Sequence, residues 1–128
     1  MNFKTTLIWI NALVFIAYGL GFVFFPETLG LLVTGSAPST SSGVIDMRAT
    51  YGGMTVGLGV LFGLSARDPR TVRLGVWGII VVMIGMASGR LFGMIQDGTP
   101  NSIMYIYLAL EIVMVILASW ALRRETSE

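Results

Sequence analysis

Four long apolar stretches, each about the length needed to cross a bilayer, constrain this chain more than any other feature. A transmembrane helix needs about 20 mostly apolar residues. The sequence offers such stretches at about 5–25, 47–65, 72–95 and 100–122, and most of the prolines and charges lie outside them. Their length favours helices over buried strands. The sequence therefore predicts an all-α integral membrane protein, an antiparallel four-helix bundle that forms a single domain over residues 1–128.

The composition excludes several classes of function. Hydrophobic residues make up 55 % of the chain and charged residues 12 %, about half the share in soluble domains. The net charge of +1 gives no basic signal, so we expect no nucleic-acid partner. The chain contains no His and no Cys, which removes the usual ligands of metals and haem and the thiol nucleophile. We therefore expect a protein that is not an enzyme, with no catalytic residue, no cofactor and no metal.

The ends of the first and last spans carry helix-boundary signals. Thr5 or Thr6 is expected to cap the first helix, and Pro26 is expected to end it because proline cannot continue the hydrogen-bond ladder. At the last span, Thr99 is the expected N-cap, with Pro100 at the first helical position.

The first connection is long and runs from Pro26 to about Asp46. It begins with the apolar segment Leu29–Val33, which we interpret as a short interfacial element, and continues with a Gly- and Ser-rich loop over 35–43. The other two connections are short, which favours antiparallel neighbours.

The distribution of basic residues predicts the orientation of the spans. With four crossings, both termini and the second connection lie on one side of the membrane. That side holds Lys4, Arg67, Arg70, Arg73, Arg123 and Arg124. The other side holds only Arg48 and Arg90. The positive-inside rule therefore places both termini in the cytoplasm, in a multi-pass protein of the cytoplasmic membrane.

Small residues recur at four-residue spacing in two spans. The second span carries Ala49, Gly53 and Gly57, and the third carries Gly85, Gly89 and Gly93. Such rows let two helices approach closely within a bilayer. The two rows are expected to pack against each other within one chain, and the alternative is a dimerisation surface.

Two charges lie inside the predicted spans. Arg90 is about 8 Å and Glu111 about 12 Å below the outer boundary, from the rise of an α-helix. An isolated charge at such depth is costly, so a partner is expected. We predict that Glu111 pairs with Arg90, with Arg48 as the second candidate.

Helical spacing brings further polar residues toward the same depth. The predicted cluster opens outward and consists of Arg48, Tyr51, Thr55, Arg90, Asp97, Tyr107 and Glu111. One interpretation is a structural ion pair that fixes helix register. The other is a binding site for an anionic or amphipathic ligand, a lipid headgroup or a proton.

Two features lie outside this cluster. Asn11, in the first span, is expected to form a hydrogen bond between helices. The arginines at 67, 70 and 73 act mainly as a topology signal, and contact with anionic lipids is a second interpretation.

Three segments resemble a family of small bacterial four-span proteins known as a domain of unknown function. They are "DMRATYGGMTVGLGVLFGL", "GRLFGMIQDGTP" and "LALEIVMVILA". The shared pattern covers nearly the whole chain and marks Arg48, Tyr51, Gly52, Gly53, Gly89, Arg90, Asp97, Gly98, Pro100 and Glu111. The resemblance implies a bacterial inner-membrane protein and supplies no activity. A looser likeness connects the chain to DoxX-like membrane proteins.

The sequence leaves two functions open. The first is a non-enzymatic protein that serves as an accessory or assembly subunit of a larger membrane complex, or that binds a lipid-like ligand. Its expected partners are membrane lipids and other membrane subunits or further copies of itself. The alternative is an oligomeric transporter of small molecules coupled to protons or ions, with Glu111 as the protonatable site.

Overall fold

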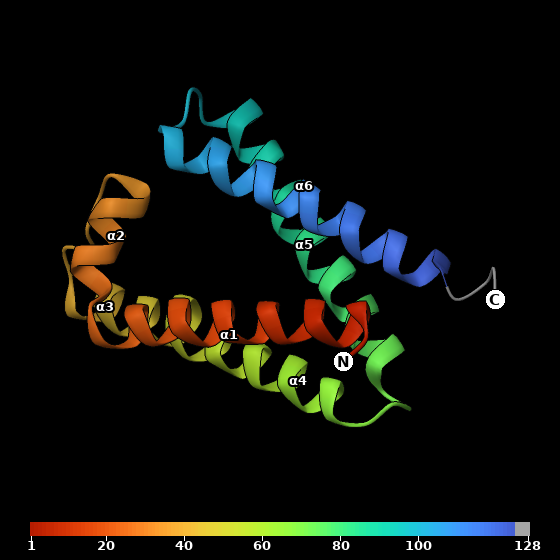
Figure 1. Cartoon of the computed structure of the whole chain (residues 1–128). Helices are drawn as coiled ribbons and strands as arrows, with labels where there is room; N and C mark the ends of the chain where they lie inside the picture. The colour runs from red at the N-terminus through yellow and green to blue at the C-terminus, as the bar shows by residue number, and fades with distance from the viewer. Residues whose placement is uncertain (125–128) are drawn as a thin grey trace.

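Four long helices form the framework of the protein (Figure 1). The computed structural model describes residues 1–124; residues 125–128, at the end of the predicted single domain, lie outside this range. The long elements are α1 (Phe3–Phe24), the helix Ser41–Arg67, α5 (Val72–Gln96) and α6 (Ser102–Arg123). Each is long and apolar enough to cross a membrane by length and composition, which confirms the prediction of an all-helical chain with four helices of this kind.

Two predicted helix caps are wrong by a few residues. Asn2 caps α1, because its side chain accepts a hydrogen bond from the backbone N–H of Thr5 at 2.9 Å. Asn101 caps α6 in the same way, with Met104 as donor at 3.2 Å, so Thr99 and Pro100 precede the helix. In both cases an Asn nearby offers the acceptor that the first helical turn needs.

The first connection contains two short helices. Pro26 ends α1 as predicted, and it is also the first residue of α2 (Pro26–Thr34), where its missing N–H costs nothing. This helix contains the predicted interfacial segment. Gly35 ends it with a φ of 80°, a left-handed conformation that favours glycine. The loop is shorter than predicted, because α3 (Ser41–Met47) already begins at Ser41.

The second span changes helix type along its length. The segment α3 continues into η1 (Arg48–Met54), a π-helical stretch of seven residues, and then into α4 (Thr55–Arg67). Hydrogen bonds in a π-helix join residues five apart and not four apart. The span is therefore one continuous helix with a wider stretch between its first and second parts.

The four spans form two antiparallel pairs. In the first pair, η1 and α4 lie along α1, and in the second, α6 lies along α5 (Figure 1). Glycines bring the backbones of the first pair into contact. A Cβ on Gly19 would lie 2.7 Å from the carbonyl oxygen of Gly52, and one on Gly59 would lie 2.8 Å from that of Ala12. Such close approach is typical of helices that pack in a bilayer.

The apolar core lies at the end of the bundle that contains the N-terminus and the α4–α5 turn. From this end the pair α5–α6 diverges from the pair α1–α4, and α2 occupies the opposite, open end (Figure 1). All four long helices contribute to the core: Leu7, Ile8, Ala12, Phe15, Phe62, Ala66, Val72, Val76, Ile79, Ile80, Met83 and Ala118. The predicted polar cluster lies toward the open end, beyond this core.

Candidate functional site

The predicted ion pair between Arg90 and Glu111 is present and joins α5 to α6. The Nη2 of Arg90 donates to Oε1 of Glu111 at 2.7 Å, and Nε lies 3.3 Å from both carboxylate oxygens. Glu111 is almost completely buried, with 3 % of its surface exposed, and the Arg90 side chain is 17 % exposed. Two donors on one carboxylate give the strongest geometry available to such a pair.

Two residues of α6 complete the surroundings of Arg90. Its Nη1 donates to the thioether sulfur of Met104 at 3.0 Å, and its guanidinium lies 5.3 Å from the centre of the Tyr107 ring. Met104, Tyr107 and Glu111 follow one another at helical spacing, so they share the face of α6 that meets α5. The prediction that Arg90, Tyr107 and Glu111 lie together is therefore confirmed.

Aromatic residues connect this cluster to the first helix pair. The hydroxyl of Tyr107 lies 3.4 Å from that of Tyr18 on α1, and Tyr18 contacts the ring of Phe22 at 5.0 Å between centroids. Phe22 in turn stacks on Tyr51 of η1 at 5.3 Å. Tyr51 is thus connected to the pair through three intervening rings, those of Phe22, Tyr18 and Tyr107, and nearly half of its surface is exposed.

Arg48 has a different role from the one predicted, because it does not pair with Glu111. Its Nη1 donates to the backbone carbonyl of Val23, in the last turn of α1. Carbonyls in the last turn of a helix lack intrahelical partners, and the end of the helix carries partial negative charge. A guanidinium donates a hydrogen bond to such a carbonyl and carries the opposite charge, so Arg48 acts as a C-terminal cap of α1.

The other two predicted cluster members lie apart from the ion pair. Thr55 is the first residue of α4 and is partly buried, and Asp97 is the exposed C-cap residue of α5. Among residues 1–124, no hydrogen bond or ion pair joins either of them to Arg90 or Glu111.

The prediction that the two small-residue rows pack against each other within the chain is wrong. All members except Gly93, which is partly exposed, lie on the surface: Ala49, Gly53, Gly57, Gly85 and Gly89. At Gly57, Gly85 and Gly89 an added Cβ would meet no atom of the described chain within 4 Å. The second span meets α1 through Gly52 and Gly59 instead, and the row of Ala49, Gly53 and Gly57 lies on an exposed face. The alternative of a surface for another chain stays a prediction.

The sequence interpretation missed Tyr18 and Phe22 on the first span. The available signal was spacing, because Asn11, Phe15, Tyr18 and Phe22 lie on one face of a helix at intervals of four and three residues. Asn11 forms the expected contact between helices, since its Nδ2 lies 3.3 Å from the sulfur of Met114 on α6. The same Nδ2 also donates to the carbonyl of Leu7 at 2.8 Å.

The chemistry of the cluster is that of a nearly saturated ion pair. Both oxygens of Glu111 face Arg90, which leaves little capacity for proton abstraction. Among the described residues of the cluster, Nη1 of Arg90 is weakly satisfied, because a thioether sulfur is a poor acceptor. The arrangement can hold two helices in register and can offer one donor to a polar ligand group.

Comparison with known proteins supports the resemblance drawn from the motifs. Neither a search of curated proteins nor a search of solved structures found a match. The sequence model of one family matches residues 3–122, which is nearly the whole chain and includes all four spans. The chain therefore belongs to the family described as "Domain of unknown function (DUF4345)".

Proposed function

We propose that this chain is a non-enzymatic, multi-pass protein of the bacterial inner membrane that acts by packing against transmembrane helices of other chains, as an accessory or assembly subunit. One observation carries the proposal. In the row formed by Gly85, Gly89 and Gly93 on α5, which has the spacing of a helix-packing surface, Gly85 and Gly89 are exposed and no other helix of the described chain lies against them.

The second helix pair offers the largest uncovered surface. Of the most apolar stretch of each span, 39 % is buried in α1 but only 17 % in α5 and 11 % in α6. The outer face of α6 carries large exposed side chains: Ile106, Leu110, Val113, Ile116 and Leu117. Because the Arg90–Glu111 pair fixes α6 on α5, these two helices can dock to a partner as one preformed unit.

A lipid-like ligand at the polar cluster is a second candidate. It is favoured by Nη1 of Arg90, whose described partner is the sulfur of Met104. A carbonyl or phosphate oxygen is a better acceptor than a thioether. The neighbouring Tyr18 and Tyr107 rings suit the apolar part of an amphipathic molecule.

Proton-coupled transport is less well supported. Such a carrier needs a carboxylate that a proton can reach, and Glu111 is buried with both oxygens facing Arg90. Transport therefore requires that the pair open during the cycle.

The test is gentle detergent extraction at native expression, followed by mass spectrometry of what co-purifies. We expect a stoichiometric partner with wild-type protein and its loss in the double variant Gly85→Leu/Gly89→Leu. Since neither position has a neighbour within 4 Å, the variant retains its own fold. The matched control is Ala17→Leu, an exposed position on α1.

Two results would overturn the proposal. The first is a self-contained oligomer whose substrate flux disappears in Glu111→Gln while folding is intact, which establishes transport. The second is a partner complex that survives the double variant, which places the contact elsewhere.

A further inference from the structure

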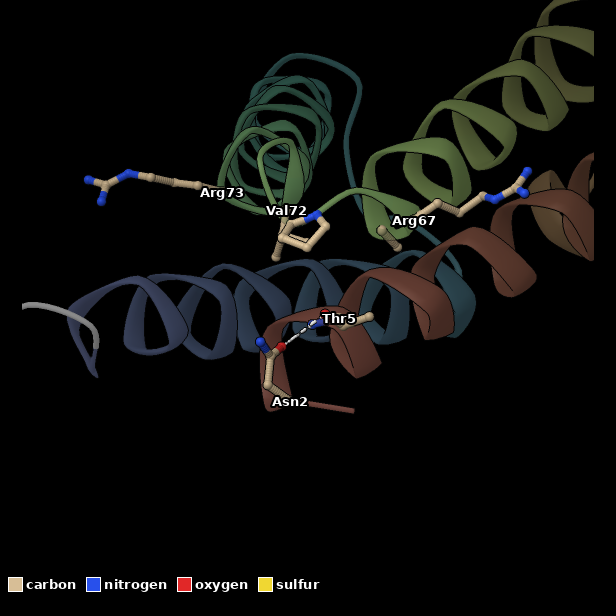
Figure 2. Close-up of a pocket in the computed structure, with 7 residues that line it drawn as sticks. Asn2, Thr5, Arg67, Val72 and Arg73 are labelled. Carbon is tan, nitrogen blue, oxygen red and sulfur yellow. Dashed lines mark hydrogen bonds between the residues drawn. The ribbon is translucent and has the colours of Figure 1, made fainter. Parts of the chain in front are cut away.

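A hollow of about 280 Å³ opens at the end of the molecule opposite the polar cluster, between the start of α1 and the turn from α4 to α5. Its lining comes from three helices and the turn: Asn2, Thr5, Ala66, Arg67, Pro69, Val72 and Arg73. Figure 2 shows Asn2 and Thr5 on one wall and Val72 facing them, with the guanidinium groups of Arg67 and Arg73 extended on opposite sides. The hollow is thus lined by the short side chains of Asn2, Thr5 and Val72, and the long cationic side chains of Arg67 and Arg73 lie at its edge.

The turn beside the hollow carries an excess of positive charge. Arg67, Arg70 and Arg73 are all exposed, and Asp68 is the one acidic residue among them. The Oδ1 of Asp68 accepts a hydrogen bond from the backbone N–H of Arg70 at 2.9 Å. The carboxylate therefore helps to form the turn, and segment 67–73 carries three arginines and one acidic residue.

The hollow lies where the spans leave the apolar layer. Three of them begin or end beside it, at Phe3, Arg67 and Val72. Trp77 and Trp120, both more than two-fifths exposed, lie toward the same end of α5 and α6. Exposed tryptophans gather at the level of lipid headgroups. Phosphate groups of lipids are therefore available at the depth of the arginines.

From this geometry we propose that the hollow and its arginines bind the phosphate group of an anionic phospholipid. Guanidinium groups match phosphate oxygens with paired hydrogen bonds. The excess charge on the turn favours a headgroup with net negative charge over a zwitterionic one, whose own cation the arginines repel. The long side chains can turn from their extended positions toward a headgroup seated on the wall formed by Asn2 and Thr5.

The test compares nanodiscs of phosphatidylcholine with nanodiscs that also contain phosphatidylglycerol. Native mass spectrometry after mild delipidation counts the lipids that remain bound. We expect wild-type protein to retain phosphatidylglycerol preferentially, and each of Arg67→Gln and Arg73→Gln, which change residues that line the hollow, to weaken retention about fivefold. Arg123→Gln removes the same charge from the end of α6, outside the hollow, and is expected to leave retention unchanged.

Two further measurements distinguish the role of the hollow from that of its charge, and binding of a lipid from binding of free phosphate. Thr5→Leu adds bulk to the wall without changing charge, and it keeps the backbone N–H that Asn2 caps. It is expected to weaken retention, with helix content checked by circular dichroism. Inorganic phosphate added to lipid-free protein in neutral detergent is expected not to raise the unfolding temperature as phosphatidylglycerol does.

Three outcomes would overturn the proposal. Equal losses in the Arg67 and Arg73 variants and in Arg123→Gln indicate a diffuse charge effect. Unchanged retention in Thr5→Leu removes the hollow from the site. Stabilisation by inorganic phosphate equal to that by phosphatidylglycerol indicates a site for a free anion.

Discussion

The side-chain amide of Asn101 donates to the backbone carbonyl of Val33 at 3.0 Å and thereby joins the start of α6 to the end of α2. Its Oδ1 accepts a hydrogen bond from Met104 at 3.2 Å and caps α6. The first N–H groups and the last carbonyls of a helix have no intrahelical partners. One side chain therefore satisfies a free group at each of two helix ends and fixes α2 against the second helix pair.

Substitutions at Asn101 should separate these two roles. Asn101→Ala loses both bonds and is expected to destabilise the protein by about 1 kcal/mol through the cap alone. Asn101→Asp keeps a capping acceptor but has no amide to donate to Val33. Both variants should increase hydrogen exchange in α2, whereas only Asn101→Ala should increase exchange at the start of α6. Unchanged exchange in α2 of both variants would contradict the link.

Removing one partner of the buried ion pair should cost far more than removing both. Glu111→Leu leaves the partly buried guanidinium of Arg90 without its carboxylate, and such a loss costs about 3 kcal/mol. Replacing both residues by leucine removes the uncompensated charge and should recover most of that stability. The measurement is reversible unfolding in mixed detergent, followed by circular dichroism.

Arg48 supplies the matched control for this experiment. Arg48→Gln removes the same charge as a substitution of Arg90, but Arg48 contacts Val23 and not Glu111. Its effect should add to that of Glu111→Leu within about 0.5 kcal/mol, as for independent sites. A coupling energy between Arg48 and Glu111 as large as that between Arg90 and Glu111 would show that the assigned partner is wrong.

Two glycines of α4 should respond oppositely to the same added methyl group. A Cβ at Gly59 would lie 2.7–2.9 Å from atoms of Ile16 and Ala12, including backbone atoms that cannot move easily. Gly59→Ala is expected to destabilise the protein by about 2 kcal/mol. At Gly57 the methyl group meets no described atom within 4 Å, so Gly57→Ala should stabilise the helix by about 0.5 kcal/mol. Thermal unfolding measures both, and equal effects would contradict the α1–α4 packing.

The orientation of the spans can be tested with reporter fusions. Because the basic residues gather at the termini and the second connection, a reporter at the C-terminus should be active only in the cytoplasm. A reporter inserted after Ser36, in the loop between α2 and α3, should be active only outside. Periplasmic activity of the C-terminal fusion would reverse the assignment.

The ion pair could be predicted from the sequence because of the cost of charge in a bilayer. A buried Glu111 requires a partner, and few cations were near the same depth. Arg90 could be chosen over Arg48 because its depth in the membrane is close to that of Glu111 and because a short connection joins the last two spans. The role of Arg48 could not be predicted, because its acceptor is a backbone carbonyl of Val23, and every residue carries such a group.

The packing faces of the second span were harder to predict for a related reason. This span carries glycines on several faces, and the sequence pattern alone does not show which face meets α1. The choice of Gly53 and Gly57 assumed a regular α-helix from Ala49 onward. The predicted row lies on an exposed face, and Gly52 and Gly59 form the contact with α1 instead.

The π-helical stretch also adds one residue to the second span without changing which way its two ends face. A π-helical turn holds about one residue more than an α-helical turn, so the helix on either side keeps its register. One residue deleted between Arg48 and Met54 would therefore allow a continuous α-helix and leave the faces of α3 and α4 in place. The residues within the stretch would shift, among them Tyr51, which stacks on Phe22, and Gly52, which meets α1. A natural relative with a single-residue gap at this point should therefore keep the faces of α3 and α4 and differ in the residues between them.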